Sequence, residues 1–145
     1  MCMFHDRITY FPQFTKKVFN EHDISKLNLD INKTQTHILM CINENYEKSM
    51  SEISLMTGLE KSSFTRSVDC LVQNGFITRI ALENDRRKIK LSLTNKGIKA
   101  AKRIKNDFDI YLDSLISDFS EKEKNEFFES LETISKYMNK ILVRK

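Results

Sequence analysis

The sequence predicts a mainly helical fold with one small β-hairpin, and three observations support this prediction. The chain of 145 residues contains only three glycines and one proline, so residues that favour turns are scarce. Hydrophobic residues make up 40% of the chain, which is enough to bury the core of one domain. Apolar residues recur at helical spacing along most of the chain, but over residues 88–93 they alternate with polar ones, as in a strand.

Two helices are predicted in the first third of the chain. Apolar residues of the first twenty positions recur at roughly helical spacing: Phe4, Ile8, Phe11, Phe14, Val18 and Phe19. Pro12 interrupts this helix and kinks or restarts it. A second helix begins after Asn32, whose side chain caps it while Gln35 reaches back. Its buried stripe is Ile38, Leu39 and Ile42.

Two further helices follow and meet at a glycine. The first begins after Ser49, with Glu52 as its capping-box partner, and ends at Thr57-Gly58. The second runs from about residue 61 to residue 74 and is followed by Gly75, where helix ends favour glycine. Its apolar side consists of Phe64, Val68, Leu71 and Val72. Its opposite side consists of Ser62, Arg66, Asp69 and Gln73, with Thr65 on the flank.

The hairpin and two long helices complete the predicted order. Residues 88–93 form a half-buried strand, residues 76–82 are its partner, and residues 83–87 form the tip. Thr94 caps a long helix, and Ser120 with Glu123 opens the last helix as a capping box. The long helix carries Ala100, Ala101, Ile104, Phe108, Tyr111, Leu112, Leu115 and Phe119. The last helix carries Phe127, Phe128, Leu131, Ile134, Met138, Ile141 and Leu142.

Positive charge is concentrated in the middle of the chain. Residues 48–105 contain 13 Lys and Arg against five Asp and Glu, a net charge of +8, whereas residues 1–47 and 106–145 carry net charges of −1 and −3. A basic region of this kind favours a polyanion, most often nucleic acid. A solvated face explains such charge equally well, so the charge alone leaves both interpretations open.

The two helices that meet at the glycine and the hairpin together have the pattern of a winged helix-turn-helix. The helix over residues 61–74 buries one face and presents a narrow polar face that fits the major groove of DNA. Ser62, Ser63 and Thr65 are small enough for close approach to phosphates or base edges, and Arg66 is long enough for a bidentate contact with guanine. The alternative is an amphipathic helix whose polar face is only solvated.

The predicted hairpin tip adds a second candidate contact. Arg86, Arg87 and Lys88 follow one another there, and the negative potential of a minor groove favours an inserted arginine. Asp85 would orient the Arg87 guanidinium through a charge-assisted hydrogen bond. In the alternative interpretation Asp85 serves a turn and the arginines increase solubility, which leaves the clustering of the cations unexplained.

These residues resemble the MarR family of bacterial regulators. The stretch from Asp85 to Gly97 is similar to the family's wing pattern, which is Asp-x-Arg, three residues, Leu-x-Leu-Thr, and Gly three residues on. The family's second signature is similar to Lys61-Ser62-Ser63-Phe64-Thr65-Arg66, followed by Leu71 and Asn74-Gly75-Phe76-Ile77. The resemblance extends from the region of Gln35 to about Gly97.

The resemblance implies a single domain with dimerisation helices in residues 1–30 and 105–145 and a DNA-binding winged helix-turn-helix in residues 31–100. It implies a cytoplasmic repressor that binds an inverted-repeat operator in double-stranded DNA as a homodimer. A small effector, phenolic or otherwise aromatic, or cysteine oxidation would regulate it. The residues to which it gives contact or positioning roles are Ser62, Ser63, Thr65, Arg66, Asp85 and Arg87, and the cluster of cations at the tip adds Arg86 and Lys88 as candidate contacts. The alternative is a winged-helix module that binds a protein partner and has little affinity for DNA.

The sequence departs from the family pattern in three places. Pro12 lies where the first helix is usually unbroken, so the dimerisation helices are expected to pack differently. Glu60 lies near a position where a capping Ser or Asp is common, and its charge would repel phosphate. The residues around Cys2 do not match the peroxide-sensing branch, so we expect that oxidation does not control this protein. Cys41 is interpreted as a filler of an apolar stripe, whereas Cys70 flanks the polar face of the helix over residues 61–74, the recognition helix, so that its oxidation would disturb DNA binding.

Other classes of function lack the residues that they need. His5, His22 and His37 are scattered, so we expect no metal site and no cofactor. No Ser-His-Asp, paired-carboxylate or phosphate-loop arrangement is present, so we expect no enzyme activity. The sequence contains no run long enough to cross a membrane and no signal-peptide core, which predicts a cytoplasmic protein. Four aromatic residues would line an effector pocket or form plain core or a dimer interface: Tyr10, Phe11, Phe14 and Tyr111.

Overall fold

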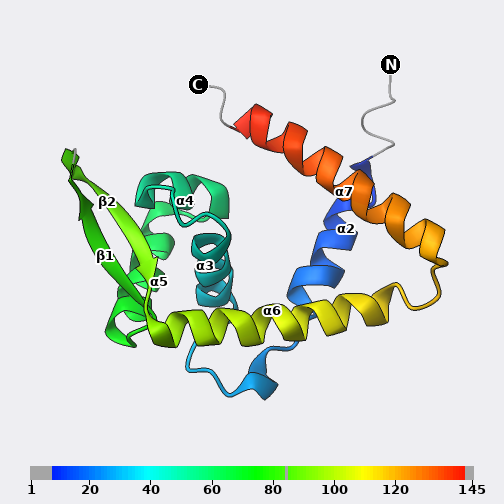
Figure 1. Ribbon diagram of the computed structural model, residues 1–145, viewed down its shortest axis with the longest axis horizontal. Coiled ribbons are helices and arrows are strands. Elements are labelled where there is room, and N and C mark those ends of the chain that lie inside the picture. Colours follow the sequence, from blue (N-terminus) through cyan, green and yellow to red (C-terminus); the bar gives the residue numbers. More distant parts are fainter. Residues whose placement is uncertain (1–7, 84, 143–145) are drawn as a thin grey trace. The chain divides into compact units, whose positions relative to one another are not determined.

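The computed structural model describes residues 8–83 and 85–142, with Arg86 described by its main chain alone (Figure 1). The chain divides into two compact units, residues 1–109 and 110–145. The elements are α2 (Phe11–Thr15), η1 (Lys16–Asn20), η2 (Ser25–Leu27), α3 (Lys33–Glu44), α4 (Met50–Thr57), α5 (Lys61–Gln73), β1 (Ile77–Leu82), β2 (Asp85–Leu93), α6 (Asn95–Leu115) and α7 (Glu121–Leu142). The prediction of a mainly helical fold with one β-hairpin is confirmed.

The N-terminal segment differs from the single helix that was expected over the first twenty residues. Pro12 lies in the first turn of α2, where its missing N–H leaves no intrahelical hydrogen bond unmade. The α2 helix continues directly into the π-helical turn η1, in which Val18 is buried. Pro12 therefore restarts the helix. Phe4, which was predicted to belong to it, lies outside the described residues.

Helices α3, α4 and α5 gather beside the hairpin and the first turns of α6 and enclose the core of the first unit (Figure 1). The capping boxes predicted for α3 and α4 are present, because Asn32 accepts a hydrogen bond from the N–H of Gln35 and Ser49 accepts one from that of Glu52. The predicted apolar faces are buried. The fully buried residues of this core are Ile38, Leu39, Ile42, Ile53, Phe64, Val68, Leu71, Phe76, Ile77 and Leu91, with Ala100 and Ile104 beside them.

The end of α5 directs the chain into the hairpin. Gly75 has a φ of +72°, a left-handed conformation that glycine adopts without steric cost. The N–H of Gly75 donates to the Val72 carbonyl at 3.0 Å, and the N–H of Phe76 donates to the Leu71 carbonyl at 2.9 Å. These two bonds satisfy carbonyls that the helix end leaves free. The predicted glycine stop is therefore confirmed.

The hairpin is longer and less regular than predicted. Strand β2 already begins at Asp85, which pairs with Leu82, so the connection is two residues long and not the predicted tip over 83–87. The next pair is Ala81 with Ile89, which leaves residues 86–88 in an irregular bulge of β2. An isolated bridge between Ser49 and Lys90 joins β2 to the start of α4.

The junction between the hairpin and α6 is tightly packed. Thr94 accepts a hydrogen bond from the N–H of Gly97 at 3.1 Å, which confirms its predicted role as helix cap. Its hydroxyl also lies 2.6 Å from the Gly75 carbonyl and 3.1 Å from that of Phe76. Gly97 approaches the same Phe76 carbonyl so closely that a Cβ atom on it would lie 2.0 Å from the oxygen.

The second unit consists of the end of α6 and helix α7. The predicted capping box is present, with the N–H of Ser120 donating to the Glu123 carboxylate at 2.8 Å and the N–H of Glu123 donating to the Ser120 hydroxyl at 3.3 Å. Within α7, which is described throughout, no residue is buried in the single chain. Its exposed apolar residues include Phe128, Ile134, Met138, Ile141 and Leu142. None of the described helices is both long and apolar enough to cross a membrane.

Candidate nucleic-acid interface

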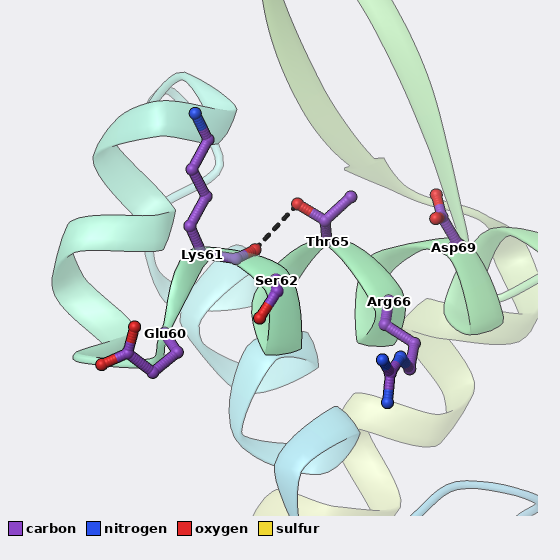
Figure 2. A pocket seen from close by; sticks show the side chains of 6 residues that line it. All are labelled: Glu60, Lys61, Ser62, Thr65, Arg66 and Asp69. Atoms are coloured by element: carbon purple, nitrogen blue, oxygen red, sulfur yellow. Dashed lines mark hydrogen bonds between the residues drawn. The ribbon is translucent and has the colours of Figure 1, made fainter.

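Helix α5 presents the predicted polar face to solvent (Figure 2). Ser62, Ser63, Thr65 and Arg66 are all exposed, while Phe64 and Val68 on the other side are buried in the core. A shallow depression lies along this face, and its lining residues are Glu60, Lys61, Ser62, Thr65, Arg66 and Asp69. The helix is therefore anchored by its apolar side and leaves four of its predicted contact residues accessible. Lys61, for which no contact was predicted, shares this surface.

The hydrogen bonds of α5 determine which polar groups are available. The Thr65 hydroxyl donates to the Lys61 carbonyl at 2.9 Å, so it offers an acceptor oxygen and a methyl group (Figure 2). A methyl group can contact thymine, and an acceptor can pair with an exocyclic amine of a base. The Arg66 side chain extends in another direction from the helix than that of Thr65. Its guanidinium is charged and carries five N–H donors, more than any other side chain on this face.

The start of α5 has no side-chain cap. Glu60 occupies the N-cap position, and its carboxylate accepts none of the hydrogen bonds described for the first turn of the helix. A glutamate side chain is too long for the geometry in which Ser, Thr, Asp or Asn caps a helix. The carboxylate is exposed instead, at the end of the face that carries Lys61 and Ser62. The missing cap agrees with the departure of Glu60 from the family pattern, in which a capping Ser or Asp is common near this position.

In the hairpin, Asp85 holds the main chain of the bulge. Its Oδ1 accepts a hydrogen bond from the N–H of Arg87 at 3.1 Å, so the contact is to the backbone and not to the guanidinium that was expected. A carboxylate bound to the N–H two residues on favours a local turn over a regular ladder, which accounts for the irregular register. Arg87 and Lys88 are exposed. The side chain of Arg86, a predicted contact, lies outside the described residues.

Basic side chains also surround the start of α4. The Glu52 pKa lies below its ordinary value because its carboxylate accepts hydrogen bonds from the backbone and the side chain of Ser49, with Lys48 and Lys88 adding attraction. Lys48 Nζ lies 3.8 Å from Glu52. Lys88 belongs to β2, so a lysine of the hairpin and Lys48, just before α4, both lie near Glu52.

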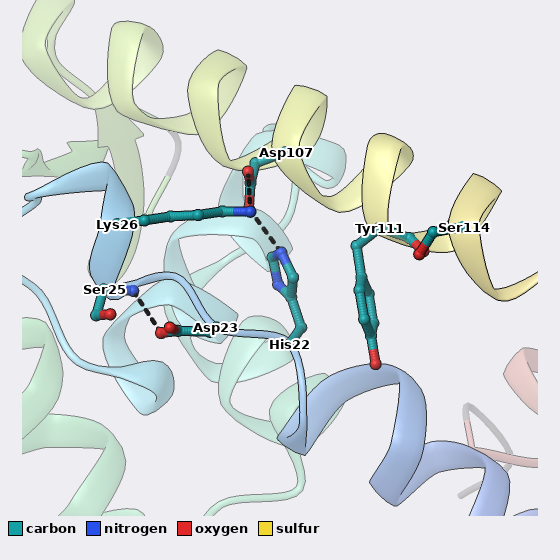
Figure 3. Close-up of polar contacts among 7 residues, drawn as sticks. All are labelled: His22, Asp23, Ser25, Lys26, Asp107, Tyr111 and Ser114. Atoms are coloured by element: carbon teal, nitrogen blue, oxygen red, sulfur yellow. Dashed lines mark hydrogen bonds and ion pairs between the residues drawn. The ribbon is translucent and has the colours of Figure 1, made fainter.

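A buried polar cluster that no pattern in the sequence indicated lies elsewhere in the first unit (Figure 3). Asp107 of α6 accepts a hydrogen bond from His22 Nε2 at 2.7 Å, and its other oxygen lies 2.9 Å from Lys26 Nζ. His22 and Asp107 are both buried. The Asp107 pKa is held below its ordinary value, first by the hydrogen bond from Lys26 and then by that from His22, against the opposing effect of burial. The cluster ties the segment before α3 to α6.

Asp107→Asn is expected to lower the free energy of unfolding at pH 7 by about 2 kcal/mol, because hydrogen bonds to a charged group contribute about that much. A depressed folded pKa means that this stability is present above the ordinary value of 3.8 and is lost as the pH falls below it. Urea unfolding at pH 7 and pH 3 should therefore give a smaller difference between variant and wild type in acid. Asp109→Asn, on the same helix but exposed, is the control. If the free energies of unfolding of Asp107→Asn and wild type differ by as much at pH 3 as at pH 7, this account is wrong.

A cavity of about 840 Å³ lies beside this cluster, between α2, η1, α3 and α6 within residues 12–109. Its aromatic walls are Phe19 and Phe108, whose rings stack with centroids 5.7 Å apart. Phe108 also contacts the edge of the His22 ring. Lysines outnumber carboxylates in its lining, with Lys16, Lys33 and Lys105 against Glu44 and Asp109, and His22 and His37 also line it. The four aromatic residues that the sequence offered as a pocket lining, Tyr10, Phe11, Phe14 and Tyr111, are all described but are not among the residues that line this cavity.

The described residues contain no group of three His, Cys, Asp or Glu side chains that could hold a metal ion. Burial raises the pKa of the Cys41 thiol, which disfavours a reactive thiolate. His5 and Cys2 lie outside the described residues.

Comparisons with known proteins agree on one family. Residues 31–89 match the family model described as MarR family. The chain is 31% identical over 96 residues to the HTH-type transcriptional regulator BilQ of Clostridioides difficile, which covers 66% of this chain and 65% of that regulator. The chain thus spans slightly less than two thirds of that relative.

Solved structures share the fold. A MarR protein from Peptoclostridium difficile superposes with a TM-score of 0.76 at 22% identity, covering 94% of this chain and 90% of that one. FabT of Streptococcus pneumoniae, solved in complex with DNA, superposes with a TM-score of 0.70 at 22% identity, covering 94% and 99%. At this identity the likeness establishes the winged-helix fold.

Proposed function

We propose that the chain is a member of the MarR family of transcriptional regulators, and that it is a repressor that binds an inverted-repeat operator as a homodimer and releases it on binding a small aromatic ligand. The family consists of regulators and not of enzymes, in agreement with the sequence analysis. The observation that carries the proposal is the exposed face of α5, which presents Ser62, Ser63, Thr65 and Arg66 to solvent and has a shallow depression lined by three of them, Ser62, Thr65 and Arg66. FabT, which has the same fold, was solved with DNA.

DNA binding is tested by titration at several salt concentrations. The probe is a duplex that the protein itself enriches from a random-sequence pool, and the control is a scrambled duplex of the same composition. Affinity is expected to fall as salt rises, because each neutralised phosphate releases counterions. Enrichment of no sequence, together with no salt-dependent binding, would favour the alternative of a protein-binding module with little affinity for DNA.

Homodimerisation is supported by the apolar residues that α7 leaves exposed in the single chain, among them Ile141 at 69% and Leu142 at 70%. Several large apolar side chains exposed along one helix are typical of a surface that another chain covers. We assign the dimer contacts to residues 1–30 and 105–145. Light scattering at micromolar concentration is expected to give a mass twice the 17.1 kDa of one chain. A stable species of one chain mass would contradict the assignment.

The cavity beside Phe19 and Phe108 is the proposed effector site. Aromatic walls favour a planar ring, and the excess of Lys over acidic residues in the lining favours a ligand with an ionised carboxylate or phenolate. Salicylate, benzoate and phenol are suitable probes. At least one of them is expected to weaken binding to the enriched duplex in wild type, and to do so less in Phe19→Ala. If none of them changes the affinity, ligand release through this cavity is not supported for this class of compound.

A further inference from the structure

Asp69 is the one acidic residue of α5, and it lies on the face that carries the candidate DNA contacts. It lines the same depression as Thr65 and Arg66 (Figure 2). A carboxylate on a surface that approaches DNA repels the phosphates. Its presence on this face therefore indicates a role that offsets the repulsion.

Asp69 is paired with an arginine of the hairpin. Arg79 of β1 donates from Nη2 to Oδ1 of Asp69 at 2.5 Å, a short charge-assisted hydrogen bond. The Arg79 side chain is 33% exposed and that of Asp69 is 50% exposed, so solvent reaches both partners. The pair is a direct side-chain link between the recognition helix and the wing.

The wing needs such a link because few of its residues belong to the core. Ile77 and Leu91, at the base of the hairpin, are buried, whereas Ile80 and Ile89 further along it are 47% and 39% exposed. A two-stranded hairpin is only marginally stable by itself. Arg79 lies two residues beyond Ile77, where the hairpin leaves the core, so its bond to Asp69 restrains the wing at its point of departure.

We propose that Asp69 and Arg79 are positioning residues, which fix the wing against α5 so that Arg66 and Arg87 reach the DNA together. This inference rests on the proposed function. Because the pair is half exposed, its contribution is that of a surface ion pair, and the expected change in DNA affinity is a few-fold.

The sign of the Asp69→Asn effect tests this proposal. The substitution removes a negative charge from the DNA-facing surface, so electrostatics alone predicts tighter binding. Loss of the positioning bond predicts the opposite, about fivefold weaker binding to the enriched duplex. The matched control is Glu60→Gln, which removes the same charge from the same face where no cap bond is lost, and is expected to tighten binding. Melting curves followed by circular dichroism confirm that both variants fold.

Arg79→Met and the double variant Asp69→Asn/Arg79→Met complete the test. If the pair positions the wing, each single substitution weakens binding and the double variant binds no more weakly than Arg79→Met alone. Tighter binding by Asp69→Asn would overturn the proposal. Weaker binding by Arg79→Met together with unchanged binding by Asp69→Asn would also overturn it, and would indicate that Arg79 contacts phosphate directly. Failure of the wild type to bind any duplex would instead overturn the proposed function.

Discussion

Replacing Gly97 by alanine is expected to lower the free energy of unfolding by about 3 kcal/mol, at the upper end of the usual cost of overpacking. The new Cβ atom would lie 2.0 Å from the Phe76 carbonyl oxygen and 3.3 Å from a methyl group of Leu93. The oxygen belongs to the backbone and accepts a hydrogen bond from the Thr94 N–H at 3.0 Å, so it cannot move aside independently. Helix propensity alone would predict the opposite sign, because alanine is the better helix former.

Gly75→Ala is the matched control for this prediction. Gly75 has a φ of +72° but open space around its Cα, so alanine there introduces backbone strain without a collision. That strain is expected to cost about 1 kcal/mol. Urea unfolding of both variants, monitored by circular dichroism, gives the comparison. A Gly97→Ala loss no larger than that of Gly75→Ala would show that the junction can relax, contrary to its tight packing.

Local rules of sequence were sufficient for much of this fold. The three capping boxes depend on residues three positions apart, and each was predicted from such a pair before the structure confirmed it. The Gly75 stop and the buried stripe of α3 likewise follow from short-range periodicity. The exposed face of α5 followed from the same argument, since burying Phe64 and Val68 forces the residues on the opposite side outward.

Features that depend on contacts between distant residues were not predicted. The His22–Asp107 bond joins residues 85 positions apart, and no periodicity indicates such a pair. Arg79 and Asp69 are 10 positions apart on different elements, so their contact depends on the angle between hairpin and helix. The hydrogen bond of Asp85 to the Arg87 backbone was not predicted for a related reason. The choice between backbone and guanidinium as its partner depends on the register of the bulge, which alternation of apolar residues does not determine.

Arg66→Ala and Arg87→Ala are expected to weaken DNA binding in two different ways. Arg66 lies on the exposed face of α5, where loss of a bidentate base contact costs about 1–3 kcal/mol on the cognate duplex and relaxes specificity at one position. Arg87 lies in the hairpin bulge, where a minor groove offers shape and potential but no unique code. Its loss should weaken binding to enriched and scrambled duplexes more evenly and reduce the salt slope by roughly one unit.

The two substitutions are separated by the ratio of affinities for the enriched and the scrambled duplex, measured at several salt concentrations. That ratio should fall in Arg66→Ala and stay nearly constant in Arg87→Ala. Asp85→Ala should resemble a weaker Arg87→Ala, because it removes the hydrogen bond that holds the backbone at Arg87 and leaves the cation in place. Lys122→Ala is the control for charge, since this exposed lysine of α7 lies outside the winged region. If Arg66→Ala and Arg87→Ala both retain wild-type affinity, α5 and the hairpin do not contact DNA as proposed, and binding of a protein partner becomes the better account of the winged domain.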